Sequence, residues 1–189
     1  RDTDRSRGLG DVYKRQALTS GHLDGMMRIR PLYQLKMLKK NRIGIKAADF
    51  TFILSTGELQ NLWDISAKYT LLLFYDPDCI YCRQSMMELS ESSIINSFLQ
   101  HSGLSLSQLA LVTICMEGEI DMWKEYQQSL PSVWINGYDV RKVLTEKELY
   151  FLRSLPSIYL LGEDKQVLLK EPSSISEVTS YLLNKYDDI

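Results

Sequence analysis

Two cysteines separated by two residues, Cys79 and Cys82, are the side chains of this sequence best suited to covalent chemistry. Residues 71–75 (LLLFY) are predicted to form a short strand buried on both faces. From Cys79 onward the spacing becomes helical, with Met86 and Leu89 on the face of Cys82. The thiols are therefore expected at a helix N-terminus, where unpaired N–H groups and the helix dipole stabilise a thiolate. This arrangement predicts thiol–disulfide exchange.

A C-x2-C pair is also half of a zinc site, which would need two further ligands. The remaining candidates are Cys115, His22 and His101, and neither histidine belongs to a compact second pair. We therefore expect no metal at Cys79 and Cys82.

The composition is that of an ordinary globular protein and gives no indication of nucleic-acid binding or of a membrane-spanning helix. The chain has 189 residues, 44% hydrophobic and 24% charged, with a net charge of −2. Such a charge gives no electrostatic reason to expect nucleic acid as a partner. No apolar run approaches the ~20 residues of a membrane-spanning helix. The third cysteine, Cys115, ends a predicted buried strand at residues 109–115 and is expected to be a structural thiol.

Three segments are predicted along the chain. Residues 1–16 show no hydrophobic period and are expected to be an adapter-derived, non-native stretch or a disordered tail. Residues 17–46 are predicted to be the helical end of a truncated upstream region, with Pro31 in the first turn of a short amphipathic helix. Residues 47–189 form the main domain. The true N-terminus is then expected to be missing.

Within the main domain, predicted strands and helices alternate, which favours an α/β fold with parallel neighbouring strands. A helix at 145–153 is predicted from a capping box, with Thr145 as N-cap and Glu148 three residues later. Residues 132–139 are expected to be a turn-rich connector. The other predicted elements are a strand at 48–54, a turn at 55–57, the Cys82 helix continuing to 100 with a break near 90–93, a helix at 120–128, a hairpin of strands at 158–161 and 166–170, and a final helix at 174–184.

Three stretches of this domain resemble the thioredoxin fold in its TlpA/ResA-like branch. They are residues 47–52 (AADFTF) with Gly57, residues 71–82, and residues 155–161 (LPSIYLL). The resemblance implies an α/β thioredoxin fold, in which helices flank a central mixed sheet and an N-terminal strand extension precedes it.

Three shorter stretches are similar to thioredoxin-like envelope lipoproteins of Gram-negative gut bacteria. These are residues 33–42, 74–79 (FYDPDC) and 134–138 (WINGY), and the whole resemblance covers about residues 28–189. It implies a periplasmic or cell-envelope protein, with a lipid anchor expected on the missing N-terminus. It also implies protein thiol or disulfide substrates and a membrane-bound electron donor or acceptor.

The resemblance also assigns roles to residues around the cysteines. Cys79 is implied to be the more exposed nucleophile and Cys82 the resolving thiol, and their disulfide is the only redox group required. Pro156 is implied to be cis and to lie beside this disulfide, so that the backbone of Leu155 meets an incoming peptide. Ile80 and Tyr81, which stand where thioredoxin has Gly-Pro, are expected to contact the substrate.

Two departures from the thioredoxin pattern bear on proton transfer. Leu73 stands where thioredoxins keep a buried aspartate, and Glu88 and Asp49 are weak candidates to replace it. Asp76 and Asp78 flank the cysteines, and nearby negative charge raises a thiol pKa. These two carboxylates are expected to oppose the helix terminus and to modulate the thiols.

The sequence thus predicts a thiol–disulfide oxidoreductase, acting in an oxidising envelope as a reductase of protein disulfides. The alternative is a non-catalytic thioredoxin-like binding module whose disulfide is structural. Peroxide reduction is not expected. The peroxiredoxin pattern needs a threonine three residues before the reactive cysteine, and that position is Asp76.

Overall fold

The computed structural model describes residues 25–100, 107–152 and 154–186, together with Val12 and Gln16. The chain divides into two compact units, residues 1–40 and residues 41–189. None of the helices in these described ranges is long and apolar enough to cross a membrane.

The described part of the N-terminal unit contains helix α2 (Gly25–Leu38). Because this helix begins well before Pro31, the prediction that Pro31 lies in its first turn is wrong. Pro31 lies inside the helix, where it lacks the N–H that an interior residue donates. Apart from Val12 and Gln16, the predicted tail at residues 1–16 lies outside the described residues.

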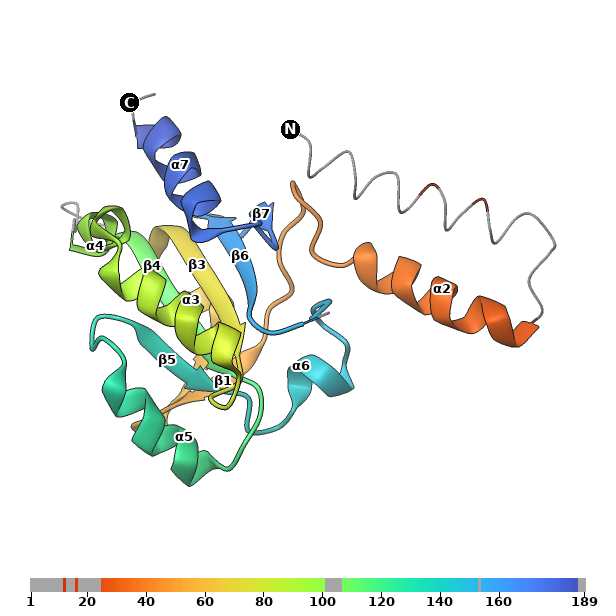
Figure 1. The fold of residues 1–189 in the computed structure, drawn as a ribbon, viewed down its shortest axis with the longest axis horizontal. Helices are drawn as coiled ribbons and strands as arrows, with labels where there is room; N and C mark the ends of the chain where they lie inside the picture. The colour runs from red at the N-terminus through yellow and green to blue at the C-terminus, as the bar shows by residue number, and fades with distance from the viewer. Residues whose placement is uncertain (1–11, 13–15, 17–24, 101–106, 153, 187–189) are drawn as a thin grey trace. The chain divides into compact units, whose positions relative to one another are not determined.

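The second unit is built on one mixed sheet with the strand order β2-β1-β5-β4-β3-β6-β7 (Figure 1). Strand β3 runs parallel to β4, and β4 runs parallel to β5, whereas the other neighbours are antiparallel. The predicted mixed sheet is thus confirmed, and β1 and β2 form its N-terminal extension. The strands are β1 (Thr51–Leu54), β2 (Leu59–Asn61), β3 (Ala67–Tyr75), β4 (Ser107–Cys115), β5 (Ile135–Tyr138), β6 (Ser157–Gly162) and β7 (Val167–Lys170).

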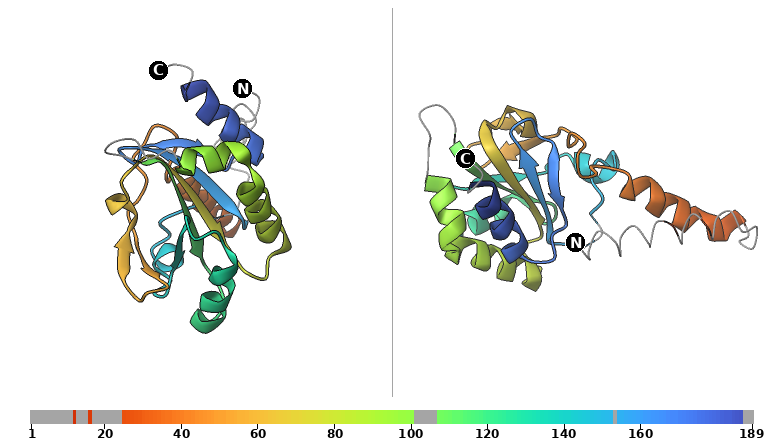
Figure 2. Two further views of the ribbon diagram at one scale, coloured as in Figure 1. Left: turned by 90° about the vertical axis from the view of Figure 1, so that its left-hand side faces the viewer. Right: turned by 90° about the horizontal axis from the view of Figure 1, so that it is seen from above.

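Five α-helices and two short 3-10 helices, η1 (Leu62–Asp64) and η2 (Gln127–Ser129), are described in this unit. Figure 2 shows α3, α4 and α7 on one side of the sheet. The predicted break in the Cys82 helix is confirmed, because Ser92 separates α3 from α4. The helices are α3 (Ile80–Glu91), α4 (Ser93–Gln100), α5 (Ile120–Tyr126), α6 (Val143–Glu146) and α7 (Ile175–Tyr186).

Strand β3 is buried on both faces because the sheet separates two hydrophobic cores. Leu71, Leu73 and Tyr75 pack with side chains of α3, α4 and α7. Leu72 and Phe74 point to the opposite face and pack with residues from β1, β6 and the α6 region. Since alternate strand residues face opposite sides of a sheet, a continuous apolar run is what this central position requires.

The prediction of a turn-rich connector at 132–139 is wrong, because residues 135–138 form β5. This strand pairs with β4 on one side and β1 on the other. Its glycine suggested a turn, but Gly137 is needed for another reason. A Cβ atom built there would lie 2.3 Å from the Phe52 ring. The glycine therefore allows a side chain of β1 to lie against the backbone of β5.

The predicted capping box is also wrong. Helix α6 begins before Thr145, and Glu148 adopts a left-handed φ of 49°. The buried carboxylate of Asp139 provides the cap instead, accepting the N–H groups of Val143 at 2.9 Å and Leu144 at 3.0 Å. A carboxylate four residues before the helix satisfies donors that a local capping box would otherwise satisfy.

The predicted β6–β7 hairpin is confirmed, and its connection contains a buried lysine. Lys165 is only 3% exposed, and its Nζ donates to Thr70 Oγ1 at 3.2 Å. Burial lowers the pKa of Lys165, while the carboxylates of Glu163 and Asp164 oppose this shift. The folded protein therefore holds an amine whose charged form has lost most of its hydration.

We expect Lys165→Met to raise the free energy of unfolding at pH 7 by about 1 kcal/mol, because methionine fills a similar volume without a charge. The unfolded chain binds more protons than the folded one between the lowered pKa and the ordinary value of 10.5. The wild-type stability therefore rises with pH across this window, and the gain from the substitution should shrink. Urea denaturation at pH 7 and pH 10 measures both effects.

The control for this experiment is Lys185→Met, which replaces an exposed lysine in the last turn of α7. It should leave stability at pH 7 within about 0.5 kcal/mol of the wild type. A lower stability of Lys165→Met than of this control at pH 7 would contradict the prediction.

Candidate active site

The cysteines lie where β3 ends and α3 begins. After Tyr75 the chain turns through Asp76 and Asp78. The Asp76 carboxylate accepts the Asp78 N–H at 2.9 Å, and the Asp76 carbonyl accepts the Cys79 N–H at 3.1 Å. This short turn brings Cys79 to the N-cap position of α3.

As N-cap, Cys79 uses its sulfur in place of the oxygen that a serine or aspartate would provide. Its Sγ accepts the Cys82 N–H at 3.3 Å. It also lies 3.6 Å from the carbonyl oxygen of Leu155, to which the thiol can donate. The half-buried Cys79 sulfur therefore has both an amide of the helix N-terminus and a peptide carbonyl within reach.

Cys82 is fully buried behind Cys79 and packs in the core beneath α3. Burial raises its pKa to about 12; a hydrogen bond with the backbone of Asp76 opposes the rise, while Cys79 and the Asp76 carboxylate add to it. Both thiols are free in this structure. The difference in exposure agrees with the predicted order of a more accessible first thiol and a buried second one.

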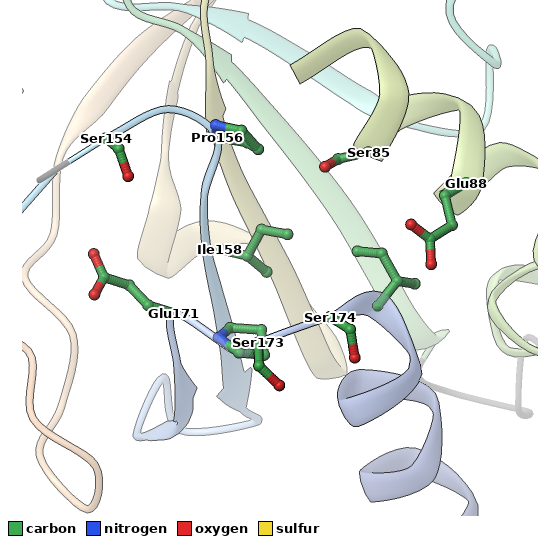
Figure 3. Close-up of a pocket in the computed structure, with 10 residues that line it drawn as sticks. Ser85, Glu88, Ser154, Pro156, Ile158, Glu171, Ser173 and Ser174 are labelled. Atoms are coloured by element: carbon green, nitrogen blue, oxygen red, sulfur yellow. The ribbon is translucent and has the colours of Figure 1, made fainter. Parts of the chain in front are cut away.

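The loop before β6 completes the site. The Leu155–Pro156 peptide bond is cis, in agreement with the expectation, and Pro156 stands immediately before the first residue of the strand. Figure 3 shows Pro156 at the edge of a cavity between this loop and α3. Leu155 is thus brought to Cys79 from a position 76 residues away along the chain.

The other predicted site residues fall into two groups. Ile80 and Tyr81 are 66% and 70% exposed on the first turn of α3, beside Cys79. The Asp76 carboxylate contributes to the raised pKa of Cys82. The exposed Asp78 instead donates its backbone N–H within the turn.

The two candidates for a replacement proton acceptor, Asp49 and Glu88, lie in different parts of the molecule. Leu73 is fully buried, as expected for an apolar residue at that position. The Asp49 carboxylate accepts a hydrogen bond from the backbone N–H of Trp63 at 3.0 Å. Asp49 also lines a separate cavity with Arg141. Glu88 is exposed on α3 and lines the cavity that begins at Pro156.

Sequence reasoning missed the polar groups that lie in the core behind Cys82. The Tyr126 hydroxyl donates to Met86 Sδ at 3.5 Å, and its ring lies 5.8 Å from that of Tyr75. Cys115 is buried beside them, where burial raises its pKa to about 12. The predicted burial of Cys115 is confirmed, but only the packing of α5 on this face brings Tyr126 close to α3.

Among the described residues, no three His, Cys, Asp or Glu side chains are grouped so that they could hold a metal ion. His22 and His101, the two histidines weighed as zinc ligands, lie outside those residues.

No protein-family model and no curated protein matches the chain. Among solved structures, a thioredoxin-like protein from Bacteroides caccae is similar, with 32% identity and a TM-score of 0.84 over 90% of this chain and 60% of that one. The C-terminal domain of an uncharacterized Bacteroides fragilis protein is 36% identical, with a TM-score of 0.70 over 76% of this chain and 98% of that domain. The thioredoxin domain of a thiol–disulfide oxidoreductase from Bacteroides vulgatus is 21% identical, with a TM-score of 0.59 over 75% and 98% of the two chains.

These matches differ in what they establish. The chain spans 60% of the length of the Bacteroides caccae protein. It covers nearly the whole of the Bacteroides fragilis domain at 36% identity, and the Bacteroides vulgatus domain shows the shared fold. With the mixed sheet, the dithiol at the strand–helix junction and the adjacent proline loop, they show that the chain belongs to the thioredoxin-like family.

Proposed function

We propose that this protein is a thiol–disulfide oxidoreductase that reduces disulfides of envelope proteins through Cys79 and Cys82. One observation supports this above the others: a half-buried thiol caps α3, next to a peptide carbonyl, with a second thiol buried directly behind it. The accessible sulfur is suited to attack a substrate, and the inner sulfur is suited to release it.

The reaction proceeds in two exchanges. The Cys79 thiolate attacks one sulfur of a substrate disulfide, forming a mixed disulfide, and the other substrate sulfur leaves and takes up a proton. Cys82 then loses its proton and attacks Cys79 Sγ. The Cys79–Cys82 disulfide forms, and the second substrate sulfur leaves. Two electrons and two protons have then passed from the dithiol to the substrate.

The second exchange is expected to be the slower one, because Cys82 must lose its proton before it attacks. Burial and the Asp76 carboxylate hold Cys82 in its protonated form. Leu73 offers no acceptor for its proton. The mixed disulfide is therefore expected to persist longer than in a thioredoxin with the buried aspartate.

Substrate contact is assigned to Leu155, Pro156, Ile80 and Tyr81. The two exposed side chains on the first turn of α3 present an apolar rim beside Cys79. A membrane-bound donor is proposed to return electrons to the disulfide, which is the only redox group that the reaction uses; neither a metal nor nucleic acid takes part. The periplasmic or envelope location belongs to the same proposal and is supported by the sequence resemblance.

The buried, protonated Cys82 also favours one alternative, a binding module in which the Cys79–Cys82 disulfide is structural. A pair that never exchanges would have the same fold and the same exposed rim. Activity measurements distinguish the two functions.

We expect the wild-type protein to catalyse reduction of insulin disulfides by dithiothreitol, and Cys79→Ser to lower the rate by at least about 100-fold, because the attacking sulfur is removed. Cys115→Ala is the matched control, since it removes a buried thiol outside the proposed reaction. Equal rates for wild type and Cys79→Ser would instead support the binding module.

Direction is tested by the reduction potential of the pair, measured in glutathione buffers by the mass shift after alkylation. For a reductase we expect a value on the side of thioredoxin, about −270 mV. A value near −120 mV would make the protein an oxidant and contradict the proposed direction.

The role of Asp76 is tested by alkylation of Cys82 in a Cys79→Ser background. The rate should rise about tenfold per pH unit up to pH 10, because the pKa of Cys82 is raised to about 12. Adding Asp76→Asn should speed alkylation several-fold, since a charge that opposes the thiolate is lost. Asp78→Asn, at an exposed site, should have a smaller effect. Slower alkylation after Asp76→Asn would show that Asp76 accepts the Cys82 proton instead.

A further inference from the structure

The tyrosine hydroxyl behind the buried thiol is a polar group to which the two exchanges described above give no role. Tyr126 is the last residue of α5 and packs into the core that contains Cys82 and Met86 of α3. Its ring lies 5.8 Å from that of Tyr75 on β3, at an interplanar angle of 36°. The ring therefore packs against the end of the strand from which the cysteines follow.

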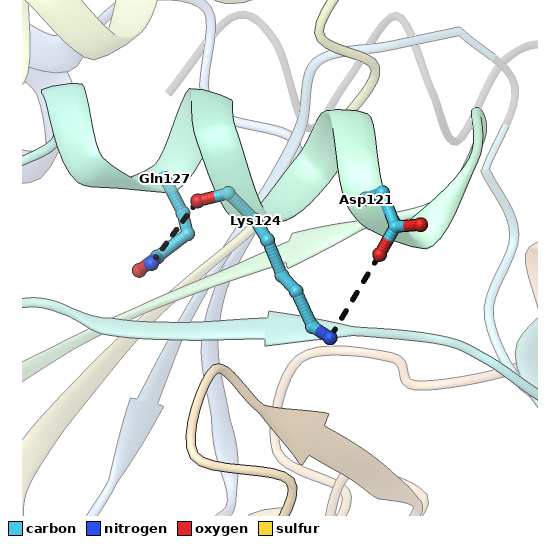
Figure 4. Close-up of polar contacts among 3 residues, drawn as sticks. All are labelled: Asp121, Lys124 and Gln127. Atoms are coloured by element: carbon cyan, nitrogen blue, oxygen red, sulfur yellow. Dashed lines mark hydrogen bonds and ion pairs between the residues drawn. The ribbon is translucent and has the colours of Figure 1, made fainter.

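The opposite side of α5 carries its charged residues. Figure 4 shows the Asp121 carboxylate 3.9 Å from Lys124 Nζ, and the Gln127 side chain donating to the Lys124 carbonyl at 3.4 Å. Trp123 and Tyr126, three residues apart, share the other face, and Trp123 is only 1% exposed. The amphipathic pattern of α5 thus directs Tyr126 toward the core.

The hydroxyl of Tyr126 has a weak partner. It donates to Met86 Sδ at 3.5 Å, and a thioether sulfur is a poor acceptor. Cys82 and Met86 are four residues apart on α3, so they are neighbours on one face of the helix. Long helical side chains point back toward the N-terminus, which for Met86 is the direction of Cys82. The hydroxyl therefore lies beside the turn that contains the resolving thiol.

The surroundings of Tyr126 keep its proton in place. Burial raises the pKa of Tyr126, Arg83 opposes the rise, and Cys82 and Cys115 add to it. The hydroxyl is thus protonated at neutral pH and is suited to donate a hydrogen bond, not to remove the Cys82 proton. A thiolate is a better acceptor than a thioether, because a charged acceptor strengthens the hydrogen bond.

We propose that the Tyr126 hydroxyl turns its hydrogen from Met86 Sδ to the sulfur of Cys82 as Cys82 ionises, and so stabilises the resolving thiolate during the second exchange. The proposal rests on the proposed reductase function and adds a hydrogen-bond donor to it. Tyr126 keeps its own proton throughout.

The second exchange then balances as follows. Cys82 loses its proton to water, and its sulfur forms a bond with Cys79 Sγ. The bond between Cys79 Sγ and the substrate sulfur breaks, and its electron pair leaves with the substrate sulfur. The released substrate thiolate takes up a proton.

The two exchanges can be timed separately by mixing the reduced full chain with DTNB, an aromatic disulfide that releases a coloured thiolate. Attack by Cys79 releases one thiolate, in a phase whose rate rises with DTNB concentration. Attack by Cys82 on the mixed disulfide releases a second, in a phase independent of that concentration. We expect Tyr126→Phe to slow the second phase about tenfold at pH 7 and to leave the first unchanged.

Two further variants separate the hydroxyl from packing. The matched control is Tyr138→Phe, which removes a hydroxyl that donates to the Gly118 carbonyl at 2.6 Å. Its ring packs 5.4 Å from that of Trp123 on α5, so it tests the packing of the same helix, and it should leave both phases unchanged. Met86→Leu removes the present acceptor at a similar volume, so the second phase should be as fast as in the wild type or faster.

Alkylation of Cys82 in a Cys79→Ser background gives opposite signs for the two explanations. If Tyr126 donates to the thiolate, adding Tyr126→Phe should slow alkylation several-fold, because less thiolate is present. If Tyr126 only fills space, the substitution should loosen the core around Cys82 and speed alkylation.

The possible failures are distinguishable. Equal second phases in wild type and Tyr126→Phe, equal slowing of both phases, or faster alkylation of Cys82 would overturn the role of Tyr126 while the reductase function stands. Slowing by Met86→Leu as large as that by Tyr126→Phe would do the same. Absence of a second phase in the wild type would show that the two thiols do not exchange, and would overturn the proposed function as well.

Discussion

The acceptance of the Cys82 N–H by the sulfur of Cys79 is the contact on which the site depends. A helix that begins directly after a buried strand must find acceptors for its first N–H groups. Here a thiol occupies the capping position. The interaction that starts α3 therefore also holds the Cys79 sulfur at the N-terminus of the helix. The same contact therefore starts the helix and fixes the position of the thiol.

The double burial of β3 keeps this junction in place. Its side chains alternate between two cores, so the strand cannot slip by one residue without exchanging them. Its C-terminal end then presents Asp76 and Cys79 at a defined edge of the sheet. Strand β6 pairs with β3 and brings Leu155 and Pro156 to the same edge. The two halves of the site meet because neighbouring strands share a register.

The two thiols that meet at this end of the sheet differ in burial and in their electrostatic surroundings. Cys79 is half-buried, near an amide and a carbonyl, whereas Cys82 is fully buried and the Asp76 carboxylate contributes to its raised pKa. The Asp76 carboxylate disfavours the thiolate of Cys82. In the proposed function, this makes the attack of Cys82 on the mixed disulfide the slower exchange.

Local pattern in the sequence determined the features that local interactions control. The apolar run at 71–75, the helical spacing after Cys79, the break near Ser92 and the hairpin after Pro156 all appear where they were predicted, because short-range periodicity and turn residues specify them. Tertiary structure decided the rest. Gly137 lies in a strand that pairs with β1 and β4 and leaves room for the Phe52 ring, and Asp139 caps α6 from outside the helix. The burial of Lys165 has no local signal either, since it depends on contact with Thr70, which is distant in sequence.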